Sequence, residues 1–259
     1  MTPHEILATG GVESTILALQ KRIADLPSDN EPRRLLVELL VCMAQYDEVI
    51  EQLQQIQSES PNWPEIEREL YRIIRAARRR SIGAIRPTIR PESVPIHAQR
   101  RWSIIKALRH ARPEQAVRAA DAAEAVSPVL SGFVNGMEFD GLRDADDRFA
   151  SILEVYLGGE YCWFVWEGMR KLTLFEPLRL LDHVVRPGTI TLKDGREYLV
   201  HLPMVYPCSH QAGDEFALGL ETDYICPDHG PTRCVGGKLL LVGDDGEFPL
   251  RECRMIEFR

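Results

Sequence analysis

Three aspartates lie within four positions near the middle of the chain, at Asp144, Asp146 and Asp147. Carboxylates grouped in this way can hold Mg²⁺ for phosphoryl transfer or act as a general acid and base. Asp144 and Asp146, together with Glu154, would form the site of a metal-dependent enzyme. A magnesium site needs carboxylates that converge from separate elements, and neither a partner motif nor a glycine-rich phosphate loop accompanies them. The cluster alone therefore does not indicate catalysis.

The residues that follow the aspartates favour a structural interpretation. A stripe with the spacing of one buried helix face comprises Phe149, Ile152, Leu153, Tyr156 and Leu157. The glycine pair at 158–159 would end such a helix. The pattern predicts a helix that begins after the aspartates, whose carboxylates would accept backbone N–H groups at its N-terminus.

A second group of residues could ligate zinc. Cys226, His229 and Cys234 lie in the stretch CPDHGPTRC, and Cys208 and His210 precede them. The spacing is irregular and contains no pair of CxxC knuckles, so zinc is not favoured. A Cys/His nucleophile is not supported by any local protease signature. We expect a metal-free loop, no cofactor and free thiols.

The first half of the chain reads as helical hairpins. Pro27 and Pro61 lie 34 residues apart, which is the period of tetratricopeptide repeats. The stretches VESTILALQKRIADLP and YDEVIEQLQQIQSESP before them show helical apolar spacing. Ala44 corresponds to Gly10 across this period, at the tight turn between paired helices. A third hairpin would end at Pro128; a helical bundle without a groove is the alternative.

An arginine- and proline-rich stretch interrupts the helices at about residues 78–100. We interpret it as a connector. Its arginines could contact nucleic acid, but few aromatic side chains accompany them for base stacking. The net charge of the whole chain is −8, which also argues against nucleic-acid or anionic-membrane binding.

The second half changes to a strand pattern. TITLKDGREYLVHLPMVY predicts a hairpin that turns at Asp194-Gly195, and KLLLVGDDGEFPL predicts another near Asp245-Gly246. RECRMIEFR predicts a last strand. The expected class is α+β: tetratricopeptide-like hairpins over residues 1–130, then a small domain with an antiparallel sheet over 131–259.

The composition is that of a globular protein, with 44% hydrophobic and 27% charged residues among 259. The start of the sequence shows no basic region followed by an apolar one, as a secretory signal would. The most apolar run, LLVELLVCMA, is too short to span a bilayer. We therefore expect a cytoplasmic location.

Several of these residues together resemble the ImpE family, also called TagJ, of bacterial type VI secretion accessory proteins. The order and spacing agree over nearly the whole second half. The residues that carry the resemblance are Asp144, Ala145, Asp146, Arg148, Leu153, Glu154, Gly159, Tyr161, Trp163, Asp182, Pro187, Leu202, Pro203, Tyr206, Pro207, Thr222 and Asp223. Val185 stands where the family has a tryptophan, and CPDHGPTRC replaces a Gly/Gln-rich stretch.

The resemblance implies a non-catalytic adaptor. Family members bind the N-terminal helix of the sheath small subunit, TssB, and are linked to the disassembly ATPase ClpV. The residues that mark the family, together with a nearby tryptophan, form a possible partner surface: Asp144, Asp146, Arg148, Glu154, Tyr161, Trp163 and Trp166. A generic repeat scaffold with another client is the second hypothesis. The metal-dependent enzyme, with either the acidic or the Cys226/His229 ligands, is the third.

Overall fold

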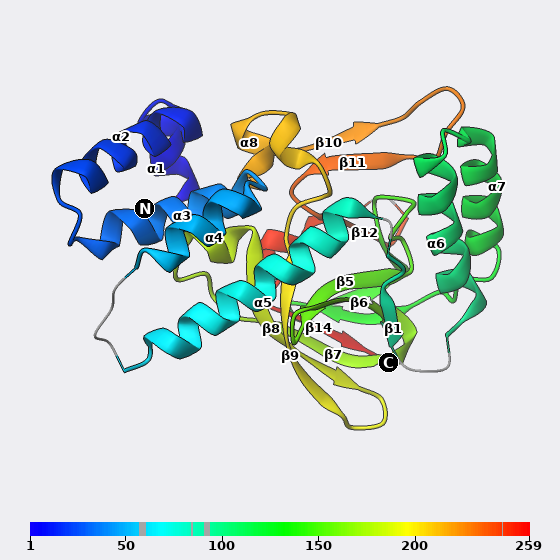
Figure 1. Ribbon diagram of the computed structural model, residues 1–259. Helices are drawn as coiled ribbons and strands as arrows, with labels where there is room; N and C mark the ends of the chain where they lie inside the picture. Colours follow the sequence, from blue (N-terminus) through cyan, green and yellow to red (C-terminus); the bar gives the residue numbers. More distant parts are fainter. Residues whose placement is uncertain (57–60, 84, 91–93, 245) are drawn as a thin grey trace.

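The computed structural model describes residues 1–56, 61–83, 85–90, 94–244 and 246–259. These residues combine helices with a large sheet, which confirms the expected α+β class (Figure 1). The helices of the described residues are α1 Pro3–Ala8, α2 Gly11–Asp25, α3 Asn30–Cys42, α4 Tyr46–Gln54, α5 Trp63–Ile82, α6 Ile96–Arg109, α7 Pro113–Glu124 and α8 Asp214–Ala217. None of them combines the length and the apolar composition that a bilayer crossing requires.

Short turns of one conformation join three pairs of these helices. Gly10 between α1 and α2, Ala44 between α3 and α4, and Ala111 between α6 and α7 all have positive φ, at 100°, 55° and 52°. A left-handed residue lets the chain reverse within three or four positions. The expected equivalence of Ala44 and Gly10 thus holds for the backbone conformation. The tetratricopeptide character of these pairs stays a prediction.

The strands of the described residues are β1 Thr88–Arg90, β2 Ser131–Val134, β3 Met137–Asp140, β4 Leu142–Asp144, β5 Ile152–Leu157, β6 Glu160–Val165, β7 Met169–Leu174, β8 Val185–Leu192, β9 Glu197–Pro203, β10 Thr222–Ile225, β11 Arg233–Gly236, β12 Leu239–Val242, β13 Gly246–Pro249 and β14 Met255–Phe258. The main sheet has the order β1-β6-β5-β9-β8-β7-β14-β2-β3. Strands β10-β11 and β13-β12-β4 form two smaller sheets. The main sheet is thus larger than expected. It is also mixed, because β1 pairs with β6 in parallel.

The helix predicted after the aspartates is wrong. Turns occupy residues 147–151, and strand β5 then forms a hairpin with β6. Gly158 and Gly159 join the two strands, with φ of 59° and 86°. Positive φ at both central residues is what a two-residue type I′ turn requires. The glycines therefore end a strand, and the aspartates do not cap a helix.

Other local predictions have mixed outcomes. The hairpin β8–β9 turns at Gly195, and β12–β13 and β14 form as expected, although Asp245 lies outside the described residues. The connector expected at about residues 78–100 stays a prediction, and regular structure occupies parts of that stretch. Helix α5 continues to Ile82, β1 lies within the stretch, and α6 begins at Ile96. Residues 84 and 91–93 of that stretch lie outside the described residues.

Apolar side chains cover both faces of the main sheet. Helix α5 runs diagonally across the sheet, while α1–α4 and the α6–α7 pair lie on opposite sides of the molecule (Figure 1). One core cluster joins residues such as Leu36 and Ile74 of the helices to Trp163 and Tyr206 of the second half. A second cluster, with Phe164 and others, lies among the strands. The helices therefore share a core with the sheet.

Candidate functional site

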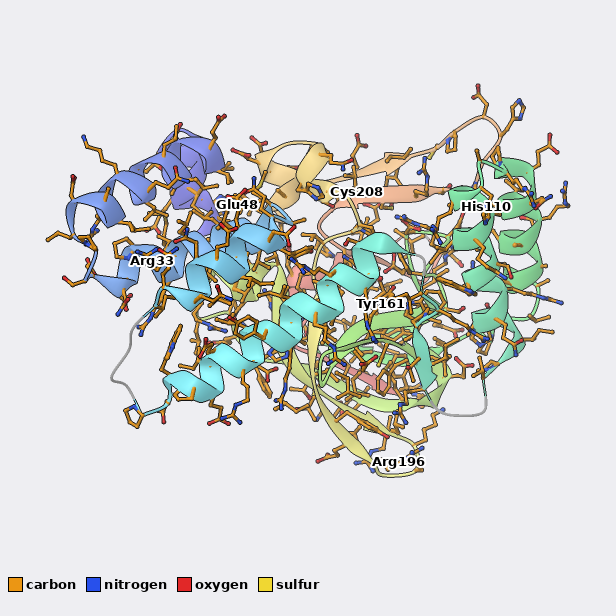
Figure 2. All side chains as sticks on the ribbon, in the orientation of Figure 1. Arg33, Glu48, His110, Tyr161, Arg196 and Cys208 are labelled. Carbon is orange, nitrogen blue, oxygen red and sulfur yellow. The ribbon has the colours of Figure 1, made fainter. Side chains whose placement is uncertain are left out.

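The residues that mark the family resemblance meet inside the protein. Strand β4 carries Asp144, the following turn carries Asp146 and Arg148, and β5 carries Glu154. Tyr161 lies where α5 crosses the strands (Figure 2). Two cations that the sequence did not single out, from α5 and from the segment before β12, complete the group. We call it the buried charge network: Arg80, Asp144, Asp146, Arg148, Glu154 and Lys238.

Glu154 lies at the centre of the network and is fully buried. Arg80 binds it with two hydrogen bonds, Nε to Oε1 at 2.8 Å and Nη2 to Oε2 at 2.7 Å. Lys238 Nζ lies 3.1 Å from Oε2, and the Tyr161 hydroxyl donates to Oε1. Burial acts to raise the pKa of Glu154, but the two cations outweigh it and lower the pKa. Glu154 is therefore a carboxylate held ionised in the core.

Asp144 shares Lys238 with Glu154. Lys238 Nζ lies 2.9 Å from Asp144 Oδ2, and the Tyr206 hydroxyl donates to Oδ1 at 2.7 Å. The ammonium group also lies 4.7 Å from the ring centre of Phe149. Burial raises the pKa of Asp144 although Lys238 opposes this. The aromatic rings and the carboxylates thus enclose the lysine completely.

Asp146 and Arg148 form a pair two residues apart. Arg148 Nη2 donates to Asp146 Oδ2 at 2.6 Å, and the Cys234 amide donates to the same oxygen at 2.9 Å. Asp146 Oδ1 accepts the Arg148 amide at 2.9 Å, which closes the turn. The D-A-D-x-R spacing therefore builds a tight turn that is joined to β11.

The network balances three cations against three carboxylates. Each of the three carboxylates accepts hydrogen bonds from donors of the protein itself. Their role is therefore to hold parts of the fold together. Among the described residues, no group of three or more His, Cys, Asp or Glu side chains is arranged to hold a metal ion. Arg80 also donates to the Val205 carbonyl at 2.9 Å. The network therefore joins α5 to the sheet.

The predicted site residues are buried in this fold. Asp144, Asp146, Glu154, Tyr161, Trp163 and Trp166 are all buried, and only the Arg148 side chain is partly exposed. The Trp163 indole donates to the Tyr161 hydroxyl at 2.7 Å, and Trp166 packs on Phe258. This burial favours an internal role. That these residues meet a partner stays a prediction.

The cysteine-containing stretch lies between β10 and β11. Cys208 and Cys226 are exposed, Cys234 is buried, and all six cysteines are free thiols. Cys234 instead donates its amide to the buried charge network. Cys234, at the end of this stretch, therefore has a structural role.

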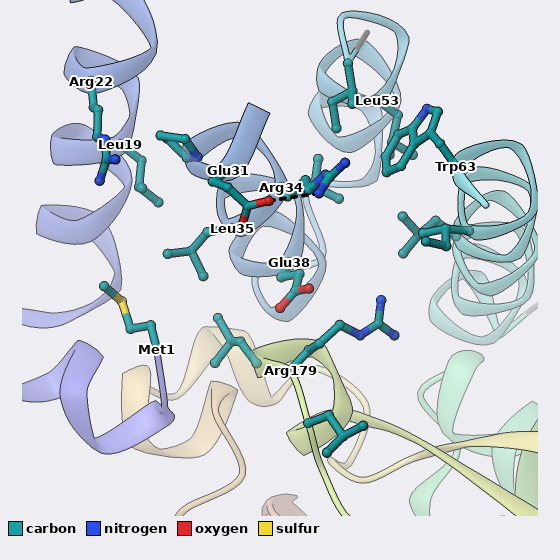
Figure 3. A pocket seen from close by; sticks show the side chains of 17 residues that line it. Met1, Leu19, Arg22, Glu31, Arg34, Leu35, Glu38, Leu53, Trp63 and Arg179 are labelled. Atoms are coloured by element: carbon teal, nitrogen blue, oxygen red, sulfur yellow. Dashed lines mark hydrogen bonds and ion pairs between the residues drawn. The ribbon is translucent and has the colours of Figure 1, made fainter. Parts of the chain in front are cut away.

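A groove lies among the helices, which we call the helical groove (Figure 3). It has a volume of about 500 Å³ and lies between α2, α3, α4, α5 and the segment 178–180. Its apolar walls include Leu19, Leu35, Leu53, Ile56, Trp63, Ile66, Leu70 and Leu180. Apolar side chains of a binding partner would fit into this groove.

Exposed apolar side chains surround the helical groove. Leu178 is 89% exposed, Met1 53% and Ile66 41%, and all three line it. Neighbouring exposed apolar residues around a hollow are typical of interaction sites. The sequence did not reveal this groove, because its walls come from segments that are up to 179 residues apart, from Met1 to Leu180.

Comparisons with known proteins agree with the resemblance. A model of the ImpE protein family matches residues 136–257. The chain is 30% identical to the type VI secretion system accessory component TagJ of Pseudomonas aeruginosa, over 100% of this chain and 91% of that protein. The crystal structure of protein VPA1032 from Vibrio parahaemolyticus has the same fold, with a TM-score of 0.90 and 23% identity, covering 99% of this chain and 97% of that one. The chain therefore belongs to the ImpE family, together with TagJ.

Proposed function

We propose that this protein is a non-catalytic accessory component of a bacterial type VI secretion system, working in the cytoplasm. The support is the full-length similarity to a protein of that name. The state of the family-marking carboxylates agrees with a non-catalytic role, because cations and backbone donors of the chain itself occupy them. The expected division at residue 130 and the tetratricopeptide-like nature of the hairpins are part of this proposal.

The proposed partner is the N-terminal helix of the sheath small subunit, TssB, with ClpV linked indirectly. The observation that carries this proposal is the helical groove. An amphipathic helix buries side chains at positions i, i+3, i+4 and i+7, and an apolar groove between helices accommodates such a row. Leu178 and Ile66 at its border are exposed apolar contacts that such a guest would cover.

Titration calorimetry with a synthetic peptide of the cognate helix tests this function. We expect micromolar affinity, about −8 kcal/mol. Leu178→Asp should weaken binding about tenfold, because it places a charge in an apolar contact. Leu199→Asp is the matched control: Leu199 is 67% exposed and lies on β9, away from the groove lining.

Two results would contradict the proposal. If neither the peptide nor the full sheath subunit binds, even at concentrations well above micromolar, a scaffold for another client becomes the better hypothesis. If both aspartate variants weaken binding equally, the groove is not the site.

A further inference from the structure

One carboxylate lies within the apolar lining of the helical groove. Glu38 extends from α3 toward the segment 178–180 (Figure 3). Its Oε2 accepts the Leu181 amide at 3.1 Å. Burial raises the pKa of Glu38, and the Arg179 charge opposes this only in part. One carboxylate oxygen of Glu38 therefore accepts a backbone hydrogen bond, and the side chain is partly shielded from water in the groove.

The other charged groups of the groove lining are already paired. Arg34 binds Glu31 at 2.8 Å, and its guanidinium lies 5.0 Å from the ring centre of Trp63. Arg22 binds Asp29 at 3.2 Å, and Arg179 binds Asp182 at 3.2 Å. Within the described part of the chain, Glu38 is the charged lining residue without an ion pair. Arg179 and the N-terminal ammonium act on Glu38 only at longer range and lower its pKa less than burial raises it, so its carboxylate has no direct cationic partner among the described residues.

A guest that fills the groove must cover this carboxylate. An apolar guest residue at that point would remove water from the free lone pairs of Glu38 and supply no donor. An ionised group buried without a partner is strongly unfavourable, so such a guest would bind weakly. The carboxylate therefore selects against a purely apolar helix face.

We propose that the guest helix places a lysine or arginine against Glu38, between its apolar anchors, and that Glu38 thereby determines specificity. This inference rests on the proposed function and adds the chemistry of the partner. A long cationic side chain suits the position, because its methylene stem covers apolar walls such as Leu35 while its head reaches the carboxylate. A charged donor also forms a stronger hydrogen bond to a carboxylate than a hydroxyl does.

A double-mutant cycle tests the inference. Peptides of the cognate sheath helix, each with one Lys or Arg changed to Met, are titrated against the wild-type protein and Glu38→Gln. Glutamine keeps an oxygen that can accept the Leu181 amide, so the fold is retained; thermal unfolding checks this. We expect one peptide change to weaken binding to the wild-type protein about tenfold and to leave binding to Glu38→Gln nearly unchanged.

Glu31→Gln is the matched control, since Glu31 lies on the border of the same groove with 75% of its side chain exposed. It should show no coupling to that peptide position. If the parent peptide binds but no Lys or Arg couples to Glu38, the inference is wrong and the proposed function stands. If the parent peptide does not bind at all, the proposed function fails and the inference fails with it.

Discussion

The buried charge network gives a sharp prediction for Arg80→Met. Methionine has a comparable length and keeps much of the apolar packing. The substitution removes both hydrogen bonds to Glu154 and the bond to the Val205 carbonyl. It leaves Glu154 fully buried with Lys238 as its remaining cation.

The magnitude follows from that geometry. Removing one partner of a buried ion pair costs about 3–5 kcal/mol, because the other charge stays buried. Lys238 continues to compensate Glu154, so we expect a loss near the lower end, about 3 kcal/mol. For a chain of this size that corresponds to a melting temperature roughly 6–12 °C lower.

The stability lost in Arg80→Met should depend on pH, and the direction of this dependence can be worked out. In the wild-type protein the pKa of Glu154 is lowered, so its contribution is present above the unfolded pKa and is lost as pH falls. Without Arg80 the pKa of Glu154 rises, and protonation then relieves the buried charge. The difference in unfolding free energy between wild type and Arg80→Met should therefore shrink as the pH is lowered from 7 toward 4.

Urea denaturation followed by circular dichroism measures this difference. The control is Arg75→Met on the same helix: Arg75 pairs with Glu160 of β6, but its side chain is 59% exposed. An exposed pair contributes about 0–1 kcal/mol, so this variant should remain near wild type. Equal destabilisation by the two variants, or a difference that does not depend on pH, would refute the argument.

Two further predictions follow from the same structure. Asp144→Ala should destabilise the protein by about 3 kcal/mol rather than the roughly 1 kcal/mol of a lost helix cap, because it leaves Lys238 with one carboxylate in the core; denaturation distinguishes the two values. Elemental analysis of the purified protein should find no stoichiometric zinc, and about one zinc per chain that disappears in Cys226→Ser would contradict this.

The fold class was predictable where the local pattern and the final structure agree. Helices α2 and α4 have one apolar face each. The turn of the β8–β9 hairpin is predicted by the Asp194-Gly195 pair in the sequence. The apolar residues of strand β5 predict a helix because five of its six residues are buried. A strand buried on both faces has no alternation, so its apolar residues fit helical spacing as well. The glycine pair between two apolar runs was the signal for a hairpin.

The candidate sites were less predictable. The resemblance identified the family-marking carboxylates and Arg148, yet the other two cations of the network, Arg80 and Lys238, lie 74 residues before Glu154 and 94 residues after Asp144. Nothing local to Arg80 or Lys238 marks them for the core. Glu38 was visible only as a charge within an apolar run. The role of Glu38 depends on its contact with the segment 178–180 and Leu181, which lie next to α3 only in the folded protein.

The position of β14 affects how the chain can fold during synthesis. β14 lies between β7 and β2, and among the described residues it is the strand that connects the β2–β3 hairpin to the rest of the main sheet. Until β14 is in place, the facing edges of β7 and β2 lack a partner strand for their backbone N–H and C=O groups. Unpaired edges of this kind readily join other nascent chains. Until β14 pairs with them, these two edges are therefore the parts of the main sheet that another chain could join.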